Sequence, residues 1–304
     1  MKRYGLILII AFACRPSIAQ QYFYNNKYYD ADYLLEAGIS VGAMNCFTDI
    51  GGRKGPGKSF LKDVNVKTTK PCFTIYSNAL YKYMWGIRIE YTRGTVTAYD
   101  SILKNDRTEA QLRYKRNLHF RSLINEFNLL GEWYLLEMIH SNRQLPPPIV
   151  SPYALAGVGL FSFNPEAKLY NQWIALQPLH TEGQGFKEYA GRKEYKLRQL
   201  NFPVGVGFKY EISARTILRF EVLYRFLITD YLDDVSENYI DPAFFNKYLS
   251  GDQSNNAILL SNRQHELDPS ALYVANQRRG NPSNKDSYYT ISLKLGIVLN
   301  RKAR

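Results

Sequence analysis

The chain has 304 residues, of which 45% are hydrophobic and 22% charged, so its composition is that of a folded protein and excludes wholesale disorder. Its mean hydropathy of −0.34 argues against a helical membrane protein, and no internal run reaches the ~18 apolar residues that a spanning helix requires. Aromatic residues make up 14% of the chain and are led by 25 tyrosines, which suits β-strands and membrane interfaces.

The N-terminus carries the one continuous apolar run. Lys2 and Arg3 precede a short apolar stretch that ends in Ser17-Ile18-Ala19, the pattern of a secretory signal peptide cleaved after Ala19. We therefore expect a signal peptide at 1–19 and a single domain at 20–304. A degraded lipoprotein signal ending at Cys14 is the alternative. Cleavage after Ala19 lowers the net charge from +12 to +9, and export argues against nucleic acid as a partner.

Alternation of apolar and polar residues with period two dominates the rest of the chain and predicts strands. In residues 288–299, for example, Tyr289, Ile291 and Leu293 share one face, whereas Thr290 and Ser292 share the other. Eight strands are predicted, at 34–45, 73–84, 86–98, 117–137, 152–164, 198–211, 216–230 and 287–299. A tight turn at Trp85-Gly86 is expected to join the second strand to the third.

The connections between these strands alternate in length. The long ones fall near 46–72, 99–116, 165–197 and 231–286, whereas short or medium ones lie between them. This pattern predicts an all-β fold: an eight-stranded antiparallel up-and-down transmembrane β-barrel of the cell outer membrane, with long outer loops and short periplasmic turns. A soluble barrel of the lipocalin type is the alternative, and it would bury its apolar face inward.

The polar faces of the strands decide between these two barrels. They carry five acidic and five basic residues: Glu36, Glu90, Glu126, Glu132, Glu221, Arg88, Lys209, Arg219, Arg225 and Lys294. Ten ionisable groups cannot all line a dry ligand cavity, but they can pair across the lumen of a membrane barrel whose apolar faces meet lipid. We therefore expect a lumen charge network that fills the narrow interior and leaves no aqueous channel.

Motifs that carry chemistry are weak in this sequence. Residues 52–59 fit the phosphate-binding loop expression, but no helical pattern follows them, so we expect no nucleotide or other cofactor. The four histidines are scattered, and the acidic residues at 230–241 lack the spacing of a calcium-binding loop, so no metal site is expected. No nucleophile motif indicates catalysis, and we expect the protein not to be an enzyme. The basic loop at 52–70 is a candidate contact for lipopolysaccharide phosphates.

Two cysteines remain in the exported chain, Cys46 and Cys72. Disulfides form in the compartments to which exported proteins go, and a bridge closing a loop of this length would contribute roughly 3 kcal/mol. A disulfide and a pair of unpaired thiols are both compatible with the sequence.

Four segments resemble one family: Arg116–Ser122, Pro152–Phe161, Leu176–Gly185 and Thr229–Ser236. The most specific residues are Thr181, Glu182, Gly183, Gln184 and Gly185 in the first motif, and Thr229, Asp230, Tyr231, Asp233 and Asp234 in the second. Together they are similar to the PorG-like outer-membrane β-barrel family associated with type IX secretion. His180 stands where that family is expected to have glycine. The resemblance implies a barrel that contacts the periplasmic ring proteins of the secretion machine.

Two functions follow as hypotheses. The first is a non-enzymatic structural or anchoring component of type IX secretion, embedded in outer-membrane lipid and touching ring proteins through its periplasmic turns and termini. The candidate contacts are the turn at Pro146–Pro148 and the basic tail of Arg301, Lys302 and Arg304. The alternative is a surface-exposed barrel whose outer loops bind lipopolysaccharide, matrix or another cell.

Overall fold

The computed structural model describes residues 32–52, 65–104, 110–142 and 150–301. The expected signal peptide, most of the phosphate-loop-like segment, the Pro146–Pro148 turn, Lys302 and Arg304 lie outside these residues. Within them no helix is long and apolar enough to cross a membrane.

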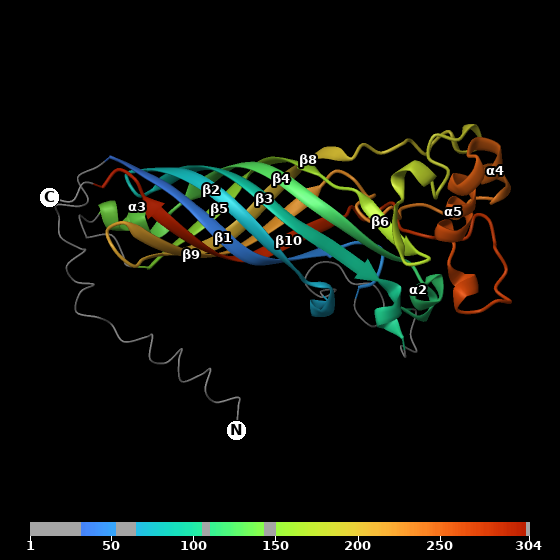
Figure 1. The fold of residues 1–304 in the computed structure, drawn as a ribbon. Coiled ribbons are helices and arrows are strands. Elements are labelled where there is room, and N and C mark those ends of the chain that lie inside the picture. The colour runs from blue at the N-terminus through green and yellow to red at the C-terminus, as the bar shows by residue number, and fades with distance from the viewer. Residues whose placement is uncertain (1–31, 53–64, 105–109, 143–149, 302–304) are drawn as a thin grey trace, which may run out of the picture.

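Eight long strands form a closed antiparallel barrel (Figure 1). They are β1 (Tyr33–Phe47), β2 (Lys70–Tyr81), β3 (Trp85–Tyr99), β4 (His119–Trp133), β5 (Val150–Ser162), β8 (Arg198–Glu211), β9 (Thr216–Leu227) and β10 (Ser287–Val298). Each barrel strand pairs with the next one along the chain, and β1 pairs with β10 to close the cylinder. The predicted eight-stranded up-and-down barrel is confirmed.

Two predicted boundaries at the periplasmic end are wrong. The turn between β2 and β3 lies at 82–84, not at Trp85-Gly86, and it places Lys82 and Tyr83 in the left-handed region with φ of 46° and 60°. The fourth strand ends at Trp133, and its predicted continuation to 137 is instead the start of helix α3 (Leu135–Asn142). Apolar runs this short fit a strand and a helix equally well, so alternation could not separate them.

The outer end carries structure that alternation did not reveal. A hairpin of β6 (Pro165–Leu169) and β7 (Gln172–Ala175) extends the sheet beyond β4. Helices α2 (Ala110–Arg116), α4 (Ala243–Tyr248) and α5 (Gly251–Ser261) lie at the same end. Short 3₁₀ helices occur at Val66–Thr68, Asp100–Leu103, Gln177–Leu179, Lys187–Tyr189 and Gln264–Glu266. We call this assembly of outer connections the outer cap; in Figure 1 it lies at the end of the barrel opposite α3.

The barrel is apolar outside and charged inside. Its outward rows expose large apolar side chains such as Ile39, Ile75, Ile87, Phe127 and Val206. Inside, a charged middle layer is flanked by two apolar layers. One includes Leu34, Leu80, Leu130, Ile217 and Val298 toward the periplasmic end, and the other includes Met44, Val96, Phe120, Ile124 and Phe161 toward the cap. This is the arrangement of a barrel solvated by lipid.

Candidate functional site

Arg88 lies at the centre of the charged lumen layer. Its guanidinium pairs with Glu132, reaches Glu221 at 2.7 Å and lies 3.4 Å from Glu90. Strand β3 places Arg88 and Glu90 on one inward row, while Glu132 comes from β4 and Glu221 from β9 on the far wall. The arginine therefore joins opposite walls of the barrel.

Two further cations extend this network. Lys294 on β10 bridges Glu90 at 2.8 Å and Glu221 at 3.1 Å. Arg219 on β9 pairs with Glu36 on β1 and lies 3.3 Å from Glu132. Seven of the ten predicted lumen residues thus form one connected network, and each of the ten is at most 2% exposed.

The other three predicted residues form separate pairs. Arg225 lies 3.0 Å from Glu126, whose carboxylate also accepts a hydrogen bond of 2.6 Å from the Asn201 amide. Lys209 lies 3.4 Å from Glu211, a residue that the sequence analysis did not select. Glu211 could have been found, because it follows Lys209 by two positions and so shares its inward face.

Buried tyrosines complete the lumen, and the sequence analysis missed them. The hydroxyls of Tyr76, Tyr134 and Tyr153 donate to Glu36 at 2.5 Å, Glu132 at 2.6 Å and Glu221 at 3.0 Å. Tyrosine was expected mainly at the membrane interfaces. These three instead occupy inward positions, where each hydroxyl donates to a carboxylate oxygen that also accepts from Arg88 or Arg219. The layer is thus filled by paired side chains.

The two family-like motifs, far apart in the sequence, meet in the outer cap. The Thr181 hydroxyl donates to Asp234 at 2.5 Å, and the Glu182 carboxylate accepts backbone N–H bonds from Ser236 at 3.1 Å and Glu237 at 2.9 Å. Gln184 accepts a bond of 3.1 Å from the Glu182 backbone N–H. The motifs therefore form one buried junction beneath the cap.

Glycines are placed in this junction where the backbone is left-handed. Gly183 has φ of 74°, and a Cβ there would lie 2.9 Å from the Tyr189 ring; Gly185 has φ of 81°. His180, which stands where the family is expected to have glycine, also takes the left-handed conformation, with φ of 49°. The conformation explains why glycine suits that position.

Acidic side chains gather next to the junction, in loops beyond the strands. Asp233 accepts backbone bonds from Ile50 at 2.9 Å and Val235 at 3.0 Å, and Asp286 accepts one from Leu232 at 2.8 Å. Burial raises the pKa of Asp230 to about 7, and it raises the pKa values of Asp233 and Asp286. In the described residues, no group of three or more His, Cys, Asp or Glu side chains is arranged to hold a metal ion.

Cys46 and Cys72 do not form the disulfide that the sequence left open; both are free thiols. Cys72 on β2 lies opposite Gly42 on β1, and Cys46 is four residues further along β1. At ~3.3 Å per residue this separates the two by roughly 13 Å, far beyond the reach of a disulfide.

The basic tail proposed from the sequence requires an accessible Arg301, but the structure buries this residue at the periplasmic end of the barrel. Its side chain is buried and pairs with Glu211 at 3.1 Å, and it donates to the Ala214 carbonyl at 2.9 Å. It closes the periplasmic end of the lumen beside Lys209, so it is not a contact for partner proteins.

Closure, the apolar outer band and the charged interior define the class: the protein is an outer-membrane β-barrel of eight strands. No family model matches the sequence, and no curated protein matches it at a significant level.

Solved structures of small outer-membrane barrels are similar to the chain. They include Ail of Yersinia pestis in complex with the heparin analogue sucrose octasulfate, with 9% identity, coverage of 87% of this chain and 99% of Ail, and a TM-score of 0.36. Neisserial surface protein A has 7% identity, coverage of 88% and 98%, and a TM-score of 0.38. OprG of Pseudomonas aeruginosa has 10% identity, coverage of 88% and 95%, and a TM-score of 0.35. At such low similarity, the class assignment rests on this barrel's own geometry.

Proposed function

We propose that the protein is a non-enzymatic, structural barrel that anchors the type IX secretion machine in the outer membrane and contacts its periplasmic ring. The observation that carries this proposal is the filled lumen, in which Arg88, Arg219 and Lys294 tie opposite walls together. A barrel braced in this way suits a fixed scaffold better than a conduit for solutes. The similarity of the 181–185 and 229–234 motifs to the PorG-like family supports the link to type IX secretion.

Helix α3 offers a contact surface at the end of the barrel opposite the outer cap (Figure 1). Leu135 is 62% exposed and Ile139 is 49% exposed. On the opposite side of the helix, Glu137 is buried and accepts a bond of 2.5 Å from the Ser151 hydroxyl of β5. This bond fixes α3 on the rim with its apolar side outward, as a contact with a periplasmic protein requires.

The test is deletion of the gene, followed by measurement of exported cargo and of ring proteins that co-purify with the barrel. The double variant Leu135→Ser and Ile139→Ser is expected to lose ring proteins and reduce cargo export. The matched control is Leu112→Ser, which alters an exposed leucine of α2 in the outer cap. Normal secretion in the deletion strain would reject the proposed role.

A surface-binding barrel is the second candidate, and one feature of the outer cap favours it. A cavity of about 640 Å³ lies between the β6–β7 hairpin and α5, with Leu169, Ile174 and Leu259 among its apolar lining and Asp252 and Asn255 among its polar lining. Deletion of 251–282 would remove one wall of this cavity. Only the binding hypothesis predicts that this deletion abolishes function while the barrel remains folded.

A further inference from the structure

The outward faces of β3 and β4 change from apolar to basic toward the cap, with Arg121 lying four register positions beyond Arg93. On β4, Phe127 and Leu123 are exposed, and Arg121 is the next outward residue toward the cap. On β3, Arg93 is exposed and follows Tyr91 on the same row. Arg121 is six residues beyond Phe127, which corresponds to a rise of roughly 14 Å at ~3.3 Å per residue and a tilt of ~45°. Arg121 therefore lies just beyond the exposed apolar row of β4, where lipid headgroups are expected to begin.

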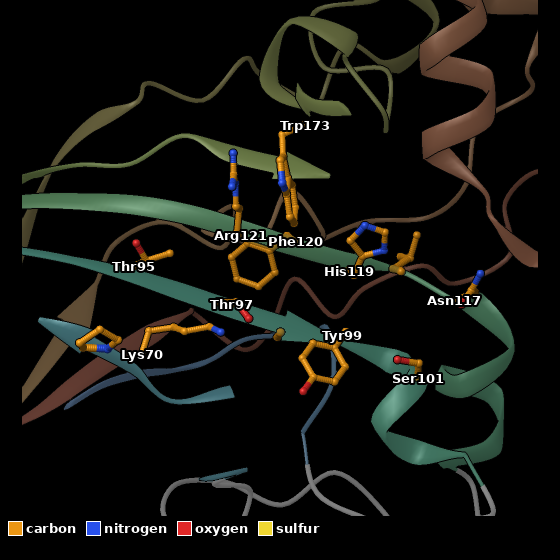
Figure 2. Close-up of a pocket in the computed structure, with 13 residues that line it drawn as sticks. Lys70, Thr95, Thr97, Tyr99, Ser101, Asn117, His119, Phe120, Arg121 and Trp173 are labelled. Carbon is orange, nitrogen blue, oxygen red and sulfur yellow. The ribbon is translucent and has the colours of Figure 1, made fainter. Parts of the chain in front are cut away.

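A pocket of about 590 Å³ opens on the barrel wall at this level (Figure 2). Lys70 of β2, Thr95 and Thr97 of β3, Arg121 of β4 and Trp173 of β7 are among the residues that line it. The strand register explains their proximity, because Thr97 lies directly opposite Arg121. The pocket thus combines two cations, several hydroxyls and an indole ring.

The guanidinium of Arg121 is held in place within this pocket. Its Nε–H donates to Glu166 at 2.8 Å, and its Cζ lies 3.9 Å from the centre of the Trp173 ring. The bond to Glu166 occupies the Nε–H of the guanidinium, so its Nη N–H groups can donate to a second anion. His119, whose ring meets Trp173 edge-on at 6.1 Å, supports the indole from the other side. Because these contacts already fix the guanidinium, little further conformational entropy is lost when an anion binds.

We propose that this pocket binds the phosphorylated saccharide headgroup of lipopolysaccharide in the outer leaflet. Lys70 and Arg121 contact phosphate, the Thr95 and Thr97 hydroxyls contact phosphate or sugar oxygens, and Trp173 packs against a sugar ring. The apolar wall below the pocket, at Ile89, Leu123 and Phe127, lies where the acyl chains of the same molecule would run. This continuity favours a lipid over a soluble polyanion. The proposal is independent of the secretion role.

The experiment compares full-length barrels extracted into mild detergent from outer membranes. Lipopolysaccharide bound per barrel is counted by native mass spectrometry, and heat-modifiable gel mobility verifies folding. The double variant Lys70→Gln and Arg121→Gln is expected to retain about fivefold to tenfold less lipopolysaccharide than wild type, because two charge-assisted contacts are lost. The matched control, Lys82→Gln and Arg215→Gln, removes two exposed cations from the periplasmic turns and should retain the wild-type amount.

Two further measurements sharpen the result. Glu166→Gln removes the carboxylate that competes for Arg121, so this variant should retain at least as much lipopolysaccharide as wild type. Lipopolysaccharide stripped of phosphate should bind wild type as weakly as intact lipopolysaccharide binds the double variant. The proposal is overturned if the double variant retains wild-type amounts, if the periplasmic control loses as much, or if soluble sucrose octasulfate binds as tightly as intact lipopolysaccharide.

Discussion

Arg279 Nη1 lies 2.8 Å from the Glu182 carboxylate in the outer cap, although the two residues are 97 positions apart. Arg279 also donates to the Asp234 carbonyl at 2.6 Å. One buried arginine therefore joins both motifs to the segment just before the last strand. Because the last family-like segment of the sequence ends at Ser236, this third partner could not be chosen from the motifs.

Replacing Arg279 should loosen the cap without opening the barrel. In Arg279→Met, the buried Glu182 carboxylate loses its cation, a change that typically costs about 3–5 kcal/mol. We expect rapid cleavage of the cap in limited proteolysis, while heat-modifiable mobility remains. Arg278→Met is the matched control, because Arg278 is exposed. Equal protease resistance in both variants would contradict a bracing role for Arg279.

Removing Arg88 should destabilise the barrel itself. Arg88→Met leaves Glu132 and Glu221 buried with fewer partners, and we expect the free energy of unfolding to fall by about 3–5 kcal/mol. Urea unfolding in detergent, followed by gel mobility, measures the loss. Arg93→Met on the same strand exchanges an exposed arginine of the outward face and should change the unfolding midpoint little. A similar midpoint for Arg88→Met and wild type would show that the lumen ion pairs do not stabilise the barrel.

The cap should be more stable at pH 5 than at pH 8. Burial raises the pKa of Asp230 to about 7 and that of Asp234 to about 6, whereas an unfolded aspartate titrates near 4. The folded cap therefore binds protons more tightly than the unfolded cap, so its stability is greatest at low pH and falls as the pH rises through 7. Proteolysis of the cap should be roughly tenfold to a hundredfold faster at pH 8 than at pH 5, relative to an unfolded substrate.

Asp230→Asn is the variant that tests this pH dependence. Its amide oxygen can still accept the Ser236 hydroxyl bond, which measures 2.7 Å in the native protein, but it carries no charge at any pH. We expect a flatter pH profile and greater protease resistance at pH 8. Asp252→Asn, at an exposed position of α5, is the control. An unchanged profile in Asp230→Asn would assign the pH dependence to other groups.

Both cysteines should remain thiols after export. Their separation of roughly 13 Å along β1 prevents bridging without moving a strand. Alkylation of the unfolded protein without reductant should therefore add two labels, measured by intact mass. A protein that takes up no label would have bridged cysteines, and it would show that the strands shift in the membrane.

Alternation predicted the barrel well because lipid and lumen impose opposite chemistry on neighbouring residues. The inward positions of Arg88 and Lys294, for example, follow directly from the period of two. Contacts across the lumen could not be predicted, since Arg88 meets Glu221 only through the closure of eight strands. The cap was beyond prediction for a related reason: Glu182 lies in the connection between β5 and β8, whereas Asp234 and Arg279 lie near opposite ends of the one between β9 and β10, and no local period relates them.

Lys294 lies on the final strand, yet it neutralises Glu90 on β3 and Glu221 on β9. Without β10, Glu90 and Glu221 would have only Arg88 as a cationic partner, so the lumen would lack part of its positive charge. A chain truncated before β10 should therefore fail to form a stable barrel in the membrane. Completion of the barrel thus depends on the last strand for charge as well as for closure.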